Sequence, residues 1–216
     1  MVSTRIFRSL SLGAVMALAA VAASAAGTPG TIVGSSHDFS ALNGGSYTCA
    51  ACHAPHGGQT VAGAPLWSHA SSTATYTMYS GTVKGTISPA PSGNSLLCLS
   101  CHDGTVAINN FGTNLGINSG TKISAANLIG NDLTNDHPIS VTYNTLLNPG
   151  LKPITNALTI GSTKTKVGTV ESNMLFGAGK TVECASCHDV HNTYVGAGNF
   201  MLKVEAAALC TTCHDK

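Results

Sequence analysis

Apolar residues form one long run in this chain, close to its start. Residues 10–23 are predominantly apolar, and they follow the basic residues Arg5 and Arg8. A basic segment followed by a short apolar run and small residues is typical of an export signal that is removed. We therefore expect residues 1–26 to be a signal peptide. No later run is apolar enough to span a bilayer, so we expect no transmembrane segment after cleavage.

The rest of the chain has only short apolar segments, separated by Gly, Asn, Thr and Ser. Residues 137–145 and 163–170 contain short β-branched runs, which predict short strands. Residues 200–214 form the best helical stretch, with Leu202, Ala206 and Leu209 expected on one face. Elsewhere the pattern predicts mostly loops.

The composition indicates that this chain needs help to form a core. Charged residues are 9% and aromatic residues 5% of the sequence. Loss of Arg5 and Arg8 with the signal peptide would leave 8 lysines against 9 acidic residues. That balance argues against a nucleic-acid partner, which requires a basic face. A chain this poor in bulky apolar residues buries too little surface to offset its ordering entropy, so we expect another component in the core.

The cysteines indicate what that component is. All eight fall into copies of one pattern, CxxCH. Disulfides do not require a histidine after the second cysteine, and zinc ribbons do not require it in every copy. The pattern is typical of c-type haem attachment. The copies are CAACH (49–53), CLSCH (98–102), CASCH (184–188) and CTTCH (210–214).

The spacing fits the chemistry of one haem per motif. Two thiols bond to the two vinyl groups of a haem, and the adjacent histidine lies under the iron as its proximal ligand. We therefore predict four covalently attached haem c groups. The predicted attachment residues are Cys49, Cys52, Cys98, Cys101, Cys184, Cys187, Cys210 and Cys213. The predicted proximal iron ligands are His53, His102, His188 and His214.

Five further histidines are candidates for the other side of the irons. His56 and His191 each follow a proximal histidine by three residues. Three extended residues span at most about 11 Å, too short to clamp both faces of one porphyrin, so each should bind a neighbouring haem. His37 and His137 lie in turn-rich segments and are also predicted distal ligands. His69 is the spare candidate.

Two strong protein ligands on every iron would leave no open position for a substrate. Such haems transfer electrons rather than bind and transform small molecules. The methionines Met78, Met174 and Met201 are better interpreted as packing residues, given the surplus of histidines. Asp103, Asp189 and Asp215 follow the motif histidines and either orient an imidazole or cap a turn; the turn role is favoured.

The motifs also show an internal duplication. A CxxCHxxH segment followed by a CxxCHD segment occurs twice. This predicts two-haem units at about residues 37–103 and 184–216, separated by a loop-rich insertion, 104–183. We expect residues 27–216 to form one domain. Its fold class should be a multihaem cytochrome c, mostly irregular, with a few short helices and short strands wrapped around a four-haem core.

Several strings resemble a known family: IVGSSHDFS, CAACHAPHGG, APLWSH, YTMYSGT, LCLSCHDGTVAI, DHPISVTYN and CASCHDVHN. They are similar to the doubled-CXXCH multihaem c-type cytochromes of metal-reducing bacteria, and among these to the OmcE-like tetrahaem, filament-forming cytochromes of the outer cell surface. The resemblance implies bis-histidine haems in a continuous chain that carries electrons to extracellular acceptors. It also implies that a histidine near the N-terminus, here His37, ligates a haem of the next subunit.

The resemblance thus predicts an electron-transfer protein rather than an enzyme. It implies secretion to the cell surface, self-association into filaments, and contacts with other redox proteins and extracellular acceptors. Two alternatives remain at this point. One is a soluble periplasmic electron shuttle, and the other is a multihaem reductase with one open haem, which would need an iron without a distal histidine.

Overall fold

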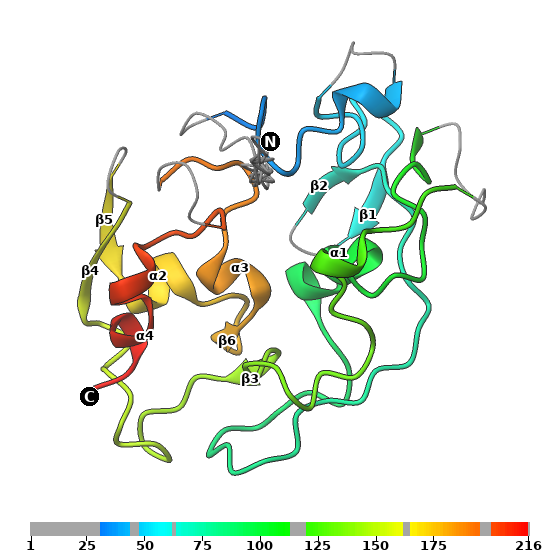
Figure 1. The fold of residues 1–216 in the computed structure, drawn as a ribbon. Coiled ribbons are helices and arrows are strands. Elements are labelled where there is room, and N and C mark those ends of the chain that lie inside the picture. Colours follow the sequence, from blue (N-terminus) through cyan, green and yellow to red (C-terminus); the bar gives the residue numbers. More distant parts are fainter. Residues whose placement is uncertain are drawn as a thin grey trace, which may run out of the picture.

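A computed structural model of the chain describes residues 31–43, 48–61, 64–112, 120–161, 165–194 and 200–215. The expected signal peptide, residues 1–26, lies outside the described residues. Within the described part, most of the chain is irregular and its helices and strands are short (Figure 1). This confirms the expected mostly irregular architecture. No helix in this part combines the length and apolar character needed to cross a membrane.

The helices cluster around the CxxCH motifs. They are α1 (Gly93–His102), α2 (Val170–Met174), α3 (Cys184–Cys187) and α4 (Ala206–Cys213), with single 3-10 turns at Ser40–Asn43 and Ala125–Asn127. Three of them, α1, α3 and α4, contain motif cysteines. The first motif instead forms a turn, in which the backbone N–H groups of Cys52 and His53 both donate to the carbonyl of Cys49.

The strands form three separate antiparallel pairs within the described residues. They are β1 (Gln59–Val61) with β2 (Ala64–Trp67), β3 (Val141–Thr142) with β6 (Thr181–Val182), and β4 (Ala157–Ile160) with β5 (Lys166–Thr169). The predictions of short strands within 137–145 and 163–170 are confirmed by β3 and β5. The β3–β6 pair joins the middle of the insertion to its end, which leads into α3 (Figure 1).

The predicted helix over residues 200–214 is only partly correct, because α4 begins at Ala206. Phe200 and Met201 have φ of 50° and 56°, a left-handed conformation that an α-helix does not contain. Next to them, Leu202 is buried and pairs with His188 as an isolated β-bridge. Pairing with the third motif therefore overrides the local helix preference, and Leu202 does not lie on the helix.

Two small apolar cores hold the two halves of the chain. The first contains Tyr76, Leu99 and Leu133, with Met78 packed against it. The second contains Tyr143, Ile160, Val170, Met174 and Leu175. Each core contacts one helix that contains motif cysteines. Leu99 of α1 belongs to the first core, and the half-buried Leu209 of α4 packs against the second.

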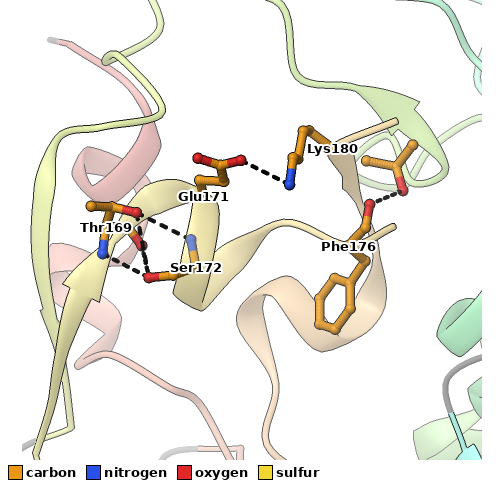
Figure 2. A network of polar contacts seen from close by, with 6 residues as sticks. Thr169, Glu171, Ser172, Phe176 and Lys180 are labelled. Carbon is orange, nitrogen blue, oxygen red and sulfur yellow. Dashed lines mark hydrogen bonds and ion pairs between the residues drawn. The ribbon is translucent and has the colours of Figure 1, made fainter. Parts of the chain in front are cut away.

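The short helix α2 is fixed at its N-terminus by side chains (Figure 2). The backbone N–H of Thr169 donates to Ser172 Oγ at 2.8 Å, and the Ser172 N–H donates to Thr169 Oγ1 at 3.2 Å. This capping box satisfies backbone donors that a helix start leaves unpaired. Glu171 of α2 forms an exposed ion pair with Lys180, with a 2.8 Å separation between Oε1 and Nζ.

Candidate haem-binding site

Three of the four motif histidines each face a histidine from a distant part of the chain. The ring centres are 6.2 Å apart for His102 and His37, 6.3 Å for His53 and His191, and 6.4 Å for His214 and His137. In each pair, one member is a predicted proximal ligand and the other a predicted distal ligand.

These separations fit a haem iron between the rings. An imidazole nitrogen binds a metal at about 2 Å and the ring centre lies about 1 Å further away, so two imidazoles on one iron have centres about 6 Å apart. All three pairs have this spacing. The residues present therefore fit the haems that the motifs imply. When bound, each haem supplies an iron that alternates between the ferric and ferrous states.

The His53–His191 pair joins the first and third attachment segments. The two rings are nearly parallel, with planes 10° apart. The turn that presents His191 is held by the Asp189 carboxylate, which accepts the backbone N–H groups of His191 at 3.2 Å and Thr193 at 2.7 Å. Asp189 thus caps the turn between His188, a predicted proximal ligand, and His191, a predicted distal ligand.

Trp67 lies beside the first motif, and its buried indole N–H has no hydrogen-bond acceptor among the described residues. Its indole ring contacts the His53 ring edge-on, with centres 6.5 Å apart. The indole Nε1 is buried and has no hydrogen-bond partner within the described part of the chain. Buried Trp N–H groups usually have an acceptor. The unpaired donor next to His53 is consistent with a polar group that occupies the site only when haem is attached.

Backbone carbonyls orient several of the paired or proximal imidazoles. Nδ1 of His102 lies 2.9 Å from the carbonyl of Asn127, and Nδ1 of His188 lies 2.9 Å from the carbonyl of Phe200. Nδ1 of His137 lies 3.0 Å from the carbonyl of Pro138. A carbonyl at Nδ1 holds the proton there and leaves Nε2 as the metal-binding atom, an arrangement common in metal sites.

His37 is held in the neutral form that an iron ligand requires. Burial, and then the charges of His102 and His188, lower the pKa of His37 to about 4. Its Nδ1 also lies 2.8 Å from the sulfur of Met201. Neutral imidazole is the species that binds metals, so His37 is ready to bind at neutral pH.

His69 has a different environment from the other four candidates. It is 2% exposed, with Nδ1 at 2.8 Å from the carbonyl of Ala70 and Nε2 at 3.1 Å from the carbonyl of Ala107. Nε2 is also 3.5 Å from the Cys101 sulfur. Burial lowers the pKa of His69, and the hydrogen bonds to backbone carbonyls oppose this. With both nitrogens engaged, His69 has the environment of a structural residue beside the second motif.

His188 and His56 complete the account of the histidines. The structure brings no ring of another described histidine into contact with that of His188. His56 is exposed on the turn after the first motif. His188, a predicted proximal ligand, and His56, a predicted distal ligand, are therefore left over, and no ring contact among the described residues joins them.

The attachment cysteines bring the motifs close to one another. All eight are free thiols, so none forms a disulfide. A hydrogen bond between the Cys98 and Cys184 thiols raises the pKa of Cys98 and lowers that of Cys184. Burial, and then the nearby Cys52, raise the pKa of Cys101 to about 12. The second motif thus adjoins both the first and the third.

The aspartate after the second motif histidine has a structural environment. Asp103 is buried and accepts hydrogen bonds from Tyr76 Oη at 2.6 Å, from the Thr105 N–H at 2.7 Å, and from the Ser72 hydroxyl. Burial raises its pKa, but these hydrogen bonds outweigh that effect and lower it. Asp103 therefore ties the loop before α1 to the end of α1.

Comparison with known proteins identifies part of this arrangement. Residues 177–216 match the family described as the doubled CXXCH motif. The match covers the third and fourth motifs, and no curated protein matches the chain. The doubled motif indicates covalently bound haem c and supports, at a coarse level, a multihaem c-type cytochrome that transfers electrons.

Two residues beside the haem sites were not predicted from the sequence. Trp67 lies two residues before His69, and the sequence pattern does not place it beside His53. Glu183, which directly precedes Cys184 and is 3% exposed, was also not predicted to lie in the site. A weak pattern was present, because Glu183 and Ser186 form a capping box at the start of α3. Such a box predicts a helix start and does not reveal that the carboxylate is buried.

Proposed function

We propose that this chain is a tetrahaem c-type cytochrome that passes electrons from haem to haem, and that it is the subunit of an extracellular conductive filament. The observation that supports this best is the set of three facing imidazole pairs. Each pair couples a CxxCH histidine with a histidine from a distant segment. Two imidazoles on an iron leave no position for a substrate, as expected for an electron carrier.

For the fourth iron we assign His56 as the partner of His188. The first and third segments share the CxxCHxxH pattern, and the third segment already places its second histidine, His191, opposite His53. By the same spacing, the first segment offers His56 in return. The other distal candidates face their own partners or, in the case of His69, have both ring nitrogens engaged. The two segments would then exchange ligands.

The residues around the pairs have defined tasks in this function. The cysteines fix each macrocycle, the imidazoles exclude other ligands, and carbonyls such as that of Asn127 keep the imidazoles oriented. The close packing of attachment segments, seen at the Cys98–Cys184 contact, keeps neighbouring haems near each other. Electron transfer along a chain of haems requires short distances between neighbouring haems.

For assembly, we propose that segment 31–43 is exchanged between neighbouring subunits. The structure places His37 beside His102 of the same chain. Exchange of this segment would form the same pair across a subunit boundary, a known low-cost route to assembly. The low charge of the chain supports self-association, since it limits repulsion between copies. Export through the signal peptide would bring the subunit to the cell surface.

Electron microscopy of the haem-loaded protein, secreted by a host that matures c-type cytochromes, tests this proposal. Filaments with a continuous series of four haems per subunit are the expected result. Dispersed monomers at all concentrations would contradict the filament and favour the soluble periplasmic shuttle.

A reductase is the second candidate function, and His188 is the reason to test it. If His56 does not bind the iron above His188, that haem has an open position. A high-spin ferric signal in the electron paramagnetic resonance (EPR) spectrum of the purified protein would then appear. The assignment of His56 predicts four low-spin haems and no such signal.

A further inference from the structure

Glu183 is a buried carboxylate at the junction of two attachment helices. It directly precedes Cys184 and is the N-cap residue of α3. Both of its oxygens accept hydrogen bonds, and every donor is a hydroxyl or a backbone N–H. The donors are Thr181 Oγ1 at 2.7 Å and Ser92 Oγ at 3.2 Å to Oε1, Ser95 Oγ at 2.5 Å and Ser140 Oγ at 3.0 Å to Oε2, and the backbone N–H of Ser186.

This environment has donors but no cation. Within the described residues, the ion pairs of the structure are Lys180–Glu171 and His191–Asp189, and neither includes Glu183. Burial of a carboxylate is costly without a compensating charge, even when hydrogen bonds satisfy its oxygens. Glu183 is therefore a buried carboxyl group that no cation of the described residues pairs with.

Glu183 lies close to two of the haem attachments. Ser95, which donates to Glu183, accepts the backbone N–H of Cys184 at 3.0 Å. Ser95 belongs to α1, which also provides Cys98, and the thiols of Cys98 and Cys184 are hydrogen-bonded. These cysteines would hold two of the haems by their thioether bonds. Glu183 thus lies beside two of the predicted attachment points.

We propose that Glu183 lowers the reduction potentials of the haems attached at Cys98 and Cys184 relative to the potentials those haems would have without it. This inference rests on the proposed function, since it requires both haems to be present. Reduction adds one electron to a ferric haem core that carries a net positive charge and leaves the core neutral. A nearby buried negative charge stabilises the ferric form, and the low dielectric of the interior strengthens the effect.

The test is a redox titration of haem-loaded Glu183→Gln followed by visible absorption, with dithionite as the reductant and ferricyanide as the oxidant. Glutamine keeps the size and one acceptor oxygen but removes the charge. We expect one or two of the four haem components to shift to higher potential and the others to stay in place. The control is Glu171→Gln, which removes the same charge from an exposed ion pair and should leave the titration curve unchanged.

A second variant is needed in case Glu183→Gln does not fold and acquire its haems. Ser92 is exposed and its hydroxyl lies 3.2 Å from Glu183 Oε1, so Ser92→Lys would place an ammonium group beside the carboxylate without altering the interior. It should shift the same components in the same direction. Titration curves that overlay the wild type, from variants that retain all their haems, would overturn the proposal.

The haem count separates this inference from the proposed function. Mass spectrometry of the wild type with fewer than four haems would contradict the tetrahaem assignment itself. Four haems with unshifted potentials in the variants would contradict only the role of Glu183.

Discussion

His53 and His191 face each other with ring planes 10° apart and ring centres 6.3 Å apart, although they come from opposite halves of the chain. His53 belongs to the first motif, and His191 follows the third across the whole insertion. An iron between them would cross-link the two ends of a long loop, and closing such a loop costs entropy that ligand binding must supply. We therefore expect haem attachment to be part of how this chain folds.

The His53–His191 pairing makes a first prediction. His191→Ala should keep four covalent haems, because no cysteine changes, but one iron should lose its second imidazole. EPR and visible absorption spectra of the ferric protein should show one high-spin haem in four. Asp189→Ala is the matched control, since it removes the carboxylate that holds the turn and leaves the imidazole in place. A fully low-spin His191→Ala protein would show that His191 is not a ligand.

His69 should behave in the opposite way. His69→Phe keeps the buried volume but removes both ring nitrogens, so the carbonyl of Ala70 or Ala107 that accepts the single N–H of the neutral ring loses its donor. Loss of this buried hydrogen bond should reduce the free energy of unfolding by about 1–3 kcal/mol. Denaturant unfolding of the haem-loaded protein measures this. All four haems should remain low-spin, and a high-spin component would instead identify His69 as a ligand.

Tyr76 offers a test of the cluster around Asp103. Tyr76→Phe removes the hydroxyl that donates to the Asp103 carboxylate at 2.6 Å. We expect a loss of about 1–3 kcal/mol in unfolding free energy, because a buried carboxylate loses a donor. Tyr79→Phe is the matched control on the same segment. Tyr79 is half-buried and its hydroxyl has no hydrogen bond within the described structure, so its effect should stay within about 0.5 kcal/mol. Equal losses in both variants would contradict a special role for Tyr76.

The parts of the site that could be predicted from the sequence are those that depend on neighbouring residues. Haem attachment requires five consecutive residues, so CxxCH is readable directly, as are the β-branched residues of β3 and β5. The separation between His188 and His191 was also informative, because three residues are too short to reach both faces of one haem. His191 then had to serve another motif, and the structure places it beside His53.

What the sequence could not show depends on contacts between distant segments. Residues 200–205 favour a helix locally, but their pairing with the third motif holds Leu202 in an extended bridge with His188. The pairing of His37 with His102 likewise follows from tertiary packing. The burial of Glu183 could not be predicted either, since its hydroxyl donors come from three separate segments: the start of α1 (Ser92 and Ser95), Ser140 and Thr181.

Cys98 provides a test of one attachment at a time. Cys98→Ala should leave one haem held by the single thioether of Cys101, or lost, while the other three stay doubly attached. Mass spectrometry of the denatured protein gives the haem count, and the pyridine haemochrome spectrum reports the number of thioether bonds. Asn94→Ala, in the same helix α1, serves as the control and should retain four haems. Four doubly attached haems in Cys98→Ala would contradict the assignment of this cysteine.

The role of His37 in assembly can be separated from its role as a ligand. His37→Ala should create one high-spin iron, because His102 loses the ring that faces it at 6.2 Å. If His37 acts across a subunit boundary, the same change should abolish filaments seen by electron microscopy while four covalent haems remain. Ser36→Ala, at the exposed neighbouring position, should leave both readouts unchanged. Normal filaments together with a high-spin iron would show that His37 and His102 bind the same iron within one subunit. Other contacts would then be responsible for assembly.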